Sequence, residues 1–164
     1  VYKRQVWGRS LQVPKSTSRV ARFTFVQLCG EPRSAADYIA LCKEFHAFFI
    51  DDIPHMNLDM RDWARRFITF VDAAYESKAR LFCTSEVDIM KVFSNTTTWD
   101  EMSSSQMRVL MDDLNMDMSD VGNSSIFSGQ EELFAFARLL SRLSEMQTKP
   151  YADMSAQLYH LNAS

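Results

Sequence analysis

Two adjacent carboxylates, Asp51 and Asp52, follow a short apolar run and are the first residues whose types and position are suited to chemistry. The run His46–Ile50 has the pattern of a strand covered on both faces, as in a parallel sheet. A carboxylate at the end of such a strand can hold magnesium through water. Arg80–Ser85 has the pattern of a neighbouring strand that ends in polar side chains. Together these features are compatible with magnesium–nucleotide chemistry.

That chemistry also requires a cradle of backbone N–H groups and a lysine for the phosphates. The sequence contains no GxxxxGK[ST] motif. Its only glycines are Gly8, Gly30, Gly122 and Gly129. Many α/β sheets place two acids after an apolar strand simply where the chain turns. We therefore favour a structural interpretation of Asp51 and Asp52, as the end of a strand leading into a loop.

The adjacent arginines Arg65 and Arg66 flank the apolar stripe of an expected helix. A fixed guanidinium at a sheet edge can reach the γ-phosphate of a nucleotide on a neighbouring subunit. The alternative is a salt-bridged helix face, because Asp62 precedes Arg65 by three residues and Arg66 by four. From the spacing alone we favour the salt-bridged face.

Arg138 and Arg142 lie one turn apart on another expected helix, so both can project from one side. They are candidates for sensing nucleotide from a lid, or for pairing with Glu145 and other surface acids. The pattern again favours ion pairs.

Other chemistry has less support. His46 and His55 lack a third ligand at a suitable spacing, so we predict no metal site. Cys83-Thr84-Ser85 has no identifiable base partner, and no GxSxG motif is present.

The elements that must position these residues alternate between strands and helices. Val6–Pro14 and Val20–Leu28 are expected to form a strand pair, with Phe23 and Phe25 on one face of the second strand. Ser34 followed by Asp37 predicts a capping box at the start of a helix that ends near Glu44.

A helix opened by Asp59 and Asp62 lies between the strands His46–Ile50 and Arg80–Thr84, and this order predicts a βαβ unit. From Ser94 to about Ser125 we expect mostly loop, with a helical turn around Met107–Leu114. A second capping box at Ser128 introduces a strong amphipathic helix that we expect to end at Pro150. After Tyr151 the chain adds a short helix or frays. The predicted fold class is α/β with a helical C-terminus.

Length and composition predict one globular core: the chain has 164 residues, of which 46% are hydrophobic. A net charge of −3 without a basic run argues against nucleic-acid binding. The three cysteines have no CxxC spacing and indicate reduced thiols rather than a disulfide framework. We interpret residues 1–5 as a non-native scar and exclude them from the fold, assign 6–152 to the domain, and treat 153–164 as a tail.

Several motifs, in order along nearly the whole chain, resemble the signature of the AFG1-like ATPases. Phe23–Cys29 followed by Ser34–Tyr38 resembles the family's FxFxxLC…AADY element, and Arg65–Ile68 with Asp72 and Tyr75 resembles its RRFIxxxDxxY helix. The other matching segments are Asp51–Pro54, Arg108–Leu114, Ser125–Gly129, Glu131–Phe136 and Ser141–Gln147. Any one match is weak, whereas seven in order make an accidental resemblance improbable.

The resemblance implies a partial P-loop-type sheet and a role in a protein that binds ATP and Mg²⁺ and hydrolyses ATP. The family's phosphate loop and magnesium-binding acid lie upstream of the matched region, so Asp51 and Asp52 do not correspond to that acid. On the same basis Arg65 and Arg66 are candidate trans-acting residues, and Arg138 and Arg142 are candidate nucleotide sensors. Protein substrates and a homo-oligomeric ring are the expected partners.

The resemblance also implies a function in protein quality control or remodelling. Its mitochondrial members favour a mitochondrial location, with an association with the inner membrane through substrates; bacterial cytoplasm is the alternative. A different hypothesis is a nucleotide-independent α/β interaction module. Under the first hypothesis this chain is the C-terminal part of the enzyme and inactive alone, and its exposed apolar surface should make it prone to aggregate.

Overall fold

A computed structural model describes residues 2–6, 9–93 and 130–162. Its centre is a four-stranded sheet of order β3-β4-β5-β6. The strands are β3 (Lys15–Thr17), β4 (Val20–Thr24), β5 (Ala47–Ile53) and β6 (Arg80–Ser85). β3 runs antiparallel to β4, whereas β4, β5 and β6 are parallel. The predicted α/β class is therefore confirmed.

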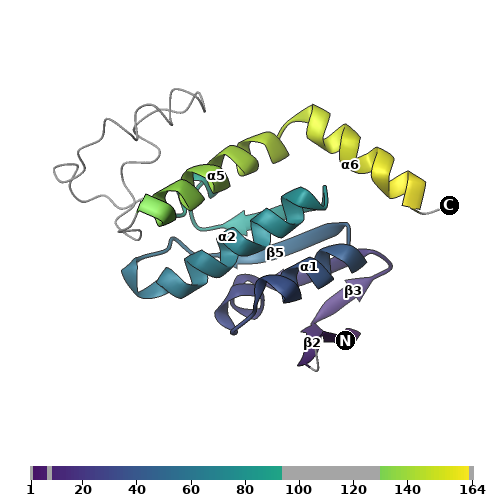
Figure 1. The fold of residues 1–164 in the computed structure, drawn as a ribbon, viewed down its shortest axis with the longest axis horizontal. Helices are drawn as coiled ribbons and strands as arrows, with labels where there is room; N and C mark the ends of the chain where they lie inside the picture. Colours follow the sequence, from purple (N-terminus) through teal and green to yellow (C-terminus); the bar gives the residue numbers. More distant parts are fainter. Residues whose placement is uncertain (1, 7–8, 94–129, 163–164) are drawn as a thin grey trace.

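Two crossovers join the parallel strands. α1 (Ala35–Glu44) links β4 to β5, and α2 (Arg61–Glu76) links β5 to β6, so the predicted βαβ unit is one of two. Short helical segments occupy Val26–Gly30, Leu58–Met60 and Ile89–Lys91. α5 (Gln130–Met146) packs beside α2, and α6 (Lys149–Asn162) follows it (Figure 1).

The predicted capping box of α1 is present. The backbone N–H of Ser34 donates to Asp37 Oδ2 at 2.7 Å, and the Ser34 hydroxyl donates to the same oxygen at 2.9 Å. Asp37 is itself buried, so these bonds satisfy a carboxylate that would otherwise be costly to bury. The capping box fixes the start of α1, after the helical turn Val26–Gly30 that follows β4.

The core lies between one face of the sheet and the layer formed by α1, α2 and α5. Phe70 of α2 packs edge-on against Phe48 of β5 and Tyr38 of α1, with ring centroids 5.3 and 5.7 Å apart. Phe136 brings α5 into the same cluster through Phe93, at 5.4 Å. Contacts of this kind join segments from both ends of the chain into one core.

The N-terminal prediction needs two corrections. The expected pairing of Val6–Pro14 with Val20–Leu28 is wrong: β2 (Arg9–Val13) pairs antiparallel with β1 (Tyr2–Val6) in a separate two-stranded sheet, and β4 pairs with β3 instead. The expected strand Val20–Leu28 ends at Thr24, because Phe25 turns into helical backbone and Val26–Gly30 forms a π-helical turn. The alternation within that strand is nevertheless observed, with Ala21 and Phe23 buried and Arg22 exposed.

The C-terminal prediction also changes. Pro150 does not end the preceding helix but lies in the first turn of α6, where proline is tolerated because that N–H has no intrahelical partner. Of the two alternatives for the chain after Tyr151, a helix or fraying, the helix is observed, and Tyr151 anchors it by donating its hydroxyl to the Ala79 carbonyl at 3.0 Å. The predictions for Ser94–Ser125, the turn around Met107–Leu114 and the Ser128 cap lie outside the described residues.

The expectation that the strand beginning near His46 is covered on both faces is wrong for the described part of the molecule. Burial alternates along β5: Phe48 and Ile50 are buried, whereas Phe49 between them is 39% exposed. The reason is that α1 and α2 lie on the same side of the sheet (Figure 1). The opposite side carries a row of partly exposed side chains.

Candidate functional site

Asp51 at the end of β5 is engaged by an arginine of the adjacent strand. Arg22 Nε donates to Asp51 Oδ2 at 2.6 Å, and Arg22 Nη2 donates to Oδ1 at 3.2 Å. The side-on geometry follows from the register, in which Arg22 lies beside Phe49 and Thr24 beside Asp51. The carboxylate raises the pKa of Arg22 through this hydrogen bond and its charge. Asp51 therefore has a structural partner already in place.

Asp52 lies on a local irregularity of the strand. Its φ of 61° is in the left-handed region, and the β5–β6 register shifts between Ile50 and Ile53. Its backbone N–H donates to Thr84 Oγ1 at 2.9 Å, and its side chain is exposed. Asp and Asn tolerate this conformation better than most residues. The two acids thus diverge. Both lie within β5 rather than in a loop after it, so the expected strand end at Ile50 is three residues too early.

Polar side chains at and just after the end of β6 lie beside the end of β5. Thr84 accepts the bond from Asp52, and Glu86 accepts the His55 N–H at 2.9 Å. In the part of the chain that the structure describes, no group of three His, Cys, Asp or Glu side chains is arranged to hold a metal ion.

The two neighbouring arginines of α2 lie in different surroundings. Arg66 is half-buried and donates from Nη1 to the carbonyls of Cys29 and Gly30, at 3.0 and 3.3 Å. It thereby holds the π-helical turn that follows β4. Arg65 is 53% exposed and lies 3.8 Å from Asp62, in the predicted i,i+3 pair. Of the two, only Arg65 presents its guanidinium largely to solvent.

Arg138 and Arg142 of α5 meet on a single acid of α2. Arg138 Nη2 donates to Asp72 Oδ2 at 2.9 Å, and Arg142 Nη1 donates to Asp72 Oδ1. Arg142 also donates to Glu76 at 2.8 Å. The expected ion pairs exist, although the partners are acids of α2 rather than Glu145. We call the cluster of Asp72, Tyr75, Glu76, Arg138, Arg142 and Glu145 the interhelix latch.

Tyr75 completes the interhelix latch. Its hydroxyl donates to Glu145 Oε2 at 2.6 Å, a bond that raises the pKa of the phenol. The Arg142 guanidinium lies over the Tyr75 ring, 4.8 Å from its centroid. These contacts join α2 to α5 through side chains that are 66 to 70 residues apart in sequence. The latch therefore connects α2 to α5 through ion pairs, a hydrogen bond and a cation–π contact.

A cationic group at the opposite ends of the strands was not predicted as a site. Arg19 Nη1 lies 2.6 Å from His46 Nε2, and Arg80 donates to the Ala152 carbonyl of α6 at 2.9 Å. These side chains border a hollow of about 340 Å³ beneath α6. In the sequence, His46 is a candidate only for metal binding, and a third ligand at a suitable spacing is missing. The available signal was that His46 and Arg80 each begin a parallel strand, so the fold places them side by side.

The sequence of this chain is similar to one protein family and to several known proteins. The family model described as AFG1-like ATPase matches residues 2–116. An uncharacterized protein of Schizosaccharomyces pombe is 41% identical over 90% of this chain, and lactation elevated protein 1 homolog B of Danio rerio is 31% identical over 89%. The cell division protein ZapE of Escherichia coli is 32% identical over 78%. No solved structure gives a significant match.

The chain spans only a minor part of these relatives: 31% of the fission-yeast protein, 29% of the zebrafish protein and 25% of ZapE. The family match begins at residue 2 and therefore includes β1. The motifs that carried the resemblance fall on or next to β4, α1, β5, α2 and α5 where they are described. By its match to the family model and its sequence identity to these relatives, this chain belongs to the AFG1-like ATPase family.

Proposed function

We propose that this chain is part of an ATP-hydrolysing AFG1-like protein that acts in protein quality control or remodelling. The observation that carries the proposal is the family match over residues 2–116. ATP and Mg²⁺ would bind mainly through residues outside this sequence, because a phosphate loop of the form GxxxxGK[ST] is absent from it. In keeping with that division, Asp51 is paired with Arg22. Asp52 lies at the register shift between β5 and β6.

Within such a protein, this part would supply packing surfaces and arginines rather than the phosphate cradle. Arg65 is the better candidate for a trans-acting residue, because Arg66 is occupied by two backbone carbonyls. For Arg138 and Arg142 to sense nucleotide, a phosphate would have to compete with Asp72 for their guanidinium groups. Their proposed role therefore includes opening the interhelix latch.

Protein substrates and a homo-oligomeric ring remain the proposed partners, with an association with the inner membrane through those substrates. No helix of the described residues has both the length and the apolarity to cross a membrane. We propose a mitochondrial location, with bacterial cytoplasm as the alternative. The relatives come from fission yeast, zebrafish and a bacterium, and so support either compartment.

The test uses a chimera in which this chain replaces the matching segment of the fission-yeast relative. We expect the chimera to hydrolyse ATP with Mg²⁺, and the 164-residue chain alone to show no saturable binding of a fluorescent ATP analogue. A folded chimera without ATPase activity would contradict the proposal. Binding by the isolated chain that is lost in Asp52→Ala would instead make β5 a working metal site.

The arginines are tested in the same chimera. Arg65→Ala should lower ATP turnover at least tenfold without lowering the melting temperature. Arg66→Ala should mainly lower the melting temperature, since it removes the donor to the Cys29 and Gly30 carbonyls. Wild-type turnover in Arg65→Ala would remove it from the mechanism.

A nucleotide-independent interaction module is the second candidate. The observation that favours it is the exposed aromatic side of the sheet, where Phe49 is 39% and Phe82 47% exposed. Saturable binding of a protein partner that is unaffected by ATP, together with an inactive chimera, would favour this candidate.

A further inference from the structure

The side of the sheet opposite α1 and α2 carries a stacked aromatic pair in its centre. Phe49 and Phe82 lie on adjacent strands in register, with ring centroids 4.7 Å apart and planes 14° from parallel. Neither ring is covered by a described element, as their exposed fractions of 39% and 47% show. Two exposed phenylalanines in direct contact form a larger apolar patch than scattered surface residues do.

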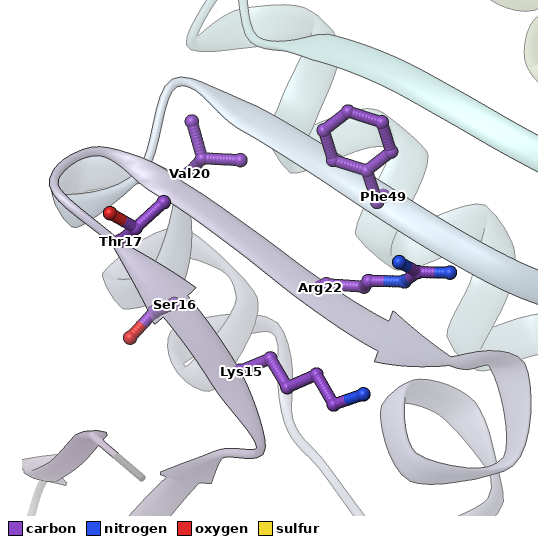
Figure 2. A pocket seen from close by; sticks show the side chains of 6 residues that line it. All are labelled: Lys15, Ser16, Thr17, Val20, Arg22 and Phe49. Carbon is purple, nitrogen blue, oxygen red and sulfur yellow. The ribbon is translucent and has the colours of Figure 1, made fainter.

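Each ring of this pair borders a hollow. The first, of about 280 Å³, lies over β3, β4 and β5; Figure 2 shows Val20, Arg22 and Phe49 projecting into it from β4 and β5. The second, of about 340 Å³, is lined by Val20, Ala47 and Phe82 and closed at one end by α6. Val20 borders both hollows, so they form one continuous surface with an apolar floor. We call this surface the aromatic face.

The rim of the aromatic face is cationic. Lys15 and Arg22 border the first hollow, where Arg22 is already paired with Asp51, and Arg19 and Arg80 border the second. No Asp or Glu is among the described side chains that line either hollow. A complementary surface therefore has an apolar centre with acidic side chains on its flanks.

The parallel direction of the strands indicates that a helix covers such a face. Parallel sheets have both faces covered, because their crossover helices pack on them, whereas an exposed face is common only in antiparallel sheets. Here β4, β5 and β6 are parallel, yet α1 and α2 cover one side only. The relatives are three to four times longer than the part this chain matches, so their remaining residues are numerous enough to supply a second layer.

We propose that the aromatic face is the docking surface for an amphipathic helix from the rest of the AFG1-like polypeptide, with an apolar stripe over Phe49 and Phe82 and acidic residues facing Lys15, Arg19 and Arg80. Such a helix makes the sheet a three-layer structure and connects this chain directly to the remainder of the protein. The inference rests on the proposed function in one respect, that this chain is part of a longer AFG1-like protein; it concerns packing and does not depend on ATP hydrolysis.

Cysteine labelling tests the proposal without nucleotide. In a Cys83→Ser background, Phe49→Cys is placed in the 164-residue chain and in the fission-yeast chimera, and its rate of reaction with a maleimide is measured. Ile39→Cys on α1 is the matched control, because Ile39 is 46% exposed on the opposite side of the sheet. Phe82→Cys is a second probe should Phe49→Cys fail to fold.

We expect the Phe49→Cys thiol to react at least tenfold more slowly in the chimera than in the isolated chain, while Ile39→Cys reacts equally in both. Equal rates for Phe49→Cys would overturn the proposal. Protection in the isolated chain that grows with protein concentration would assign the face to a second copy, and protection by a single-stranded oligonucleotide would assign it to nucleic acid; either result would overturn it. Protection in an ATPase-inactive chimera would support the docking proposal while contradicting the proposed function.

Discussion

At the scale of single residues, the structure separates acids and arginines that look alike in sequence. Asp51 and Asp52 are adjacent, yet one pairs with Arg22 and the other occupies a left-handed backbone conformation. Arg65 and Arg66 are adjacent, yet one faces solvent and the other binds backbone carbonyls. Neighbours in a strand or helix point in different directions, so adjacency does not imply a shared role.

The backbone role of Asp52 leads to a first prediction. Asp52→Asn should change the free energy of unfolding by no more than about 0.5 kcal/mol, since Asn tolerates the left-handed region. Asp52→Val should lower it by about 1–2 kcal/mol, because a β-branched side chain is strained at a φ of 61°. Urea denaturation of both variants measures the difference. A large loss in Asp52→Asn would show that the carboxylate itself matters.

His46 leads to a prediction about pH. Burial, reinforced by the nearby Arg19 charge, lowers the pKa of His46 below its usual 6.5. The unfolded chain therefore binds more protons just below pH 6.5, and the free energy of unfolding should fall as the pH drops through that range. His46→Asn should flatten this slope in urea titrations between pH 7 and 5. An unchanged slope in His46→Asn would contradict the assignment.

At the scale of elements, the described helices and parallel strands follow from local signals, but their partners do not. The capping box at Ser34, the stripe of α2 and the apolar runs of β5 and β6 could be recognised in the sequence, because each signal lies within one element. The ends of elements were less predictable. β4 stops at Thr24 and Pro150 begins α6 rather than ending α5, since packing against other segments overrides the local pattern.

The interhelix latch gives a prediction at this scale. Asp72→Ala should lower the free energy of unfolding by about 1–3 kcal/mol, because it leaves Arg138 and the half-buried Arg142 without their shared carboxylate. The control Asp62→Ala breaks only the exposed pair with Arg65 and should cost less than about 0.5 kcal/mol. Urea denaturation of the two variants compares them. Equal losses would mean that the latch contributes no more than a surface ion pair.

At the scale of the whole molecule, the uncovered side of the sheet dominates the expected behaviour. Phe49 and Phe82 expose a stacked pair next to two hollows with a cationic rim. We therefore expect the aromatic face to be the surface through which the isolated chain aggregates. A contiguous exposed apolar face of this kind marks either an interaction site or a surface prone to aggregation.

The corresponding prediction is that Phe49→Ser combined with Phe82→Ser reduces self-association of the 164-residue chain. Light scattering at rising protein concentration should show a smaller mean mass than for the unchanged chain. The control is Phe134→Ser, which removes a phenylalanine of similar exposure, 48%, on α5. Equal improvement by the control would indicate that general surface hydrophobicity, rather than the aromatic face, causes association.

The sequence by itself determined the family, the α/β class, the positions of the main helices and parallel strands, and the favoured ionic role of Arg138 and Arg142. These depend on periodicity, capping residues and motif order, which are properties of short segments. Only the tertiary structure decided that both crossover helices lie on one side, that Asp72 joins α2 to α5, and that Phe49 meets Phe82. These contacts link residues distant in sequence, and their geometry arises from how the elements pack rather than from any segment alone.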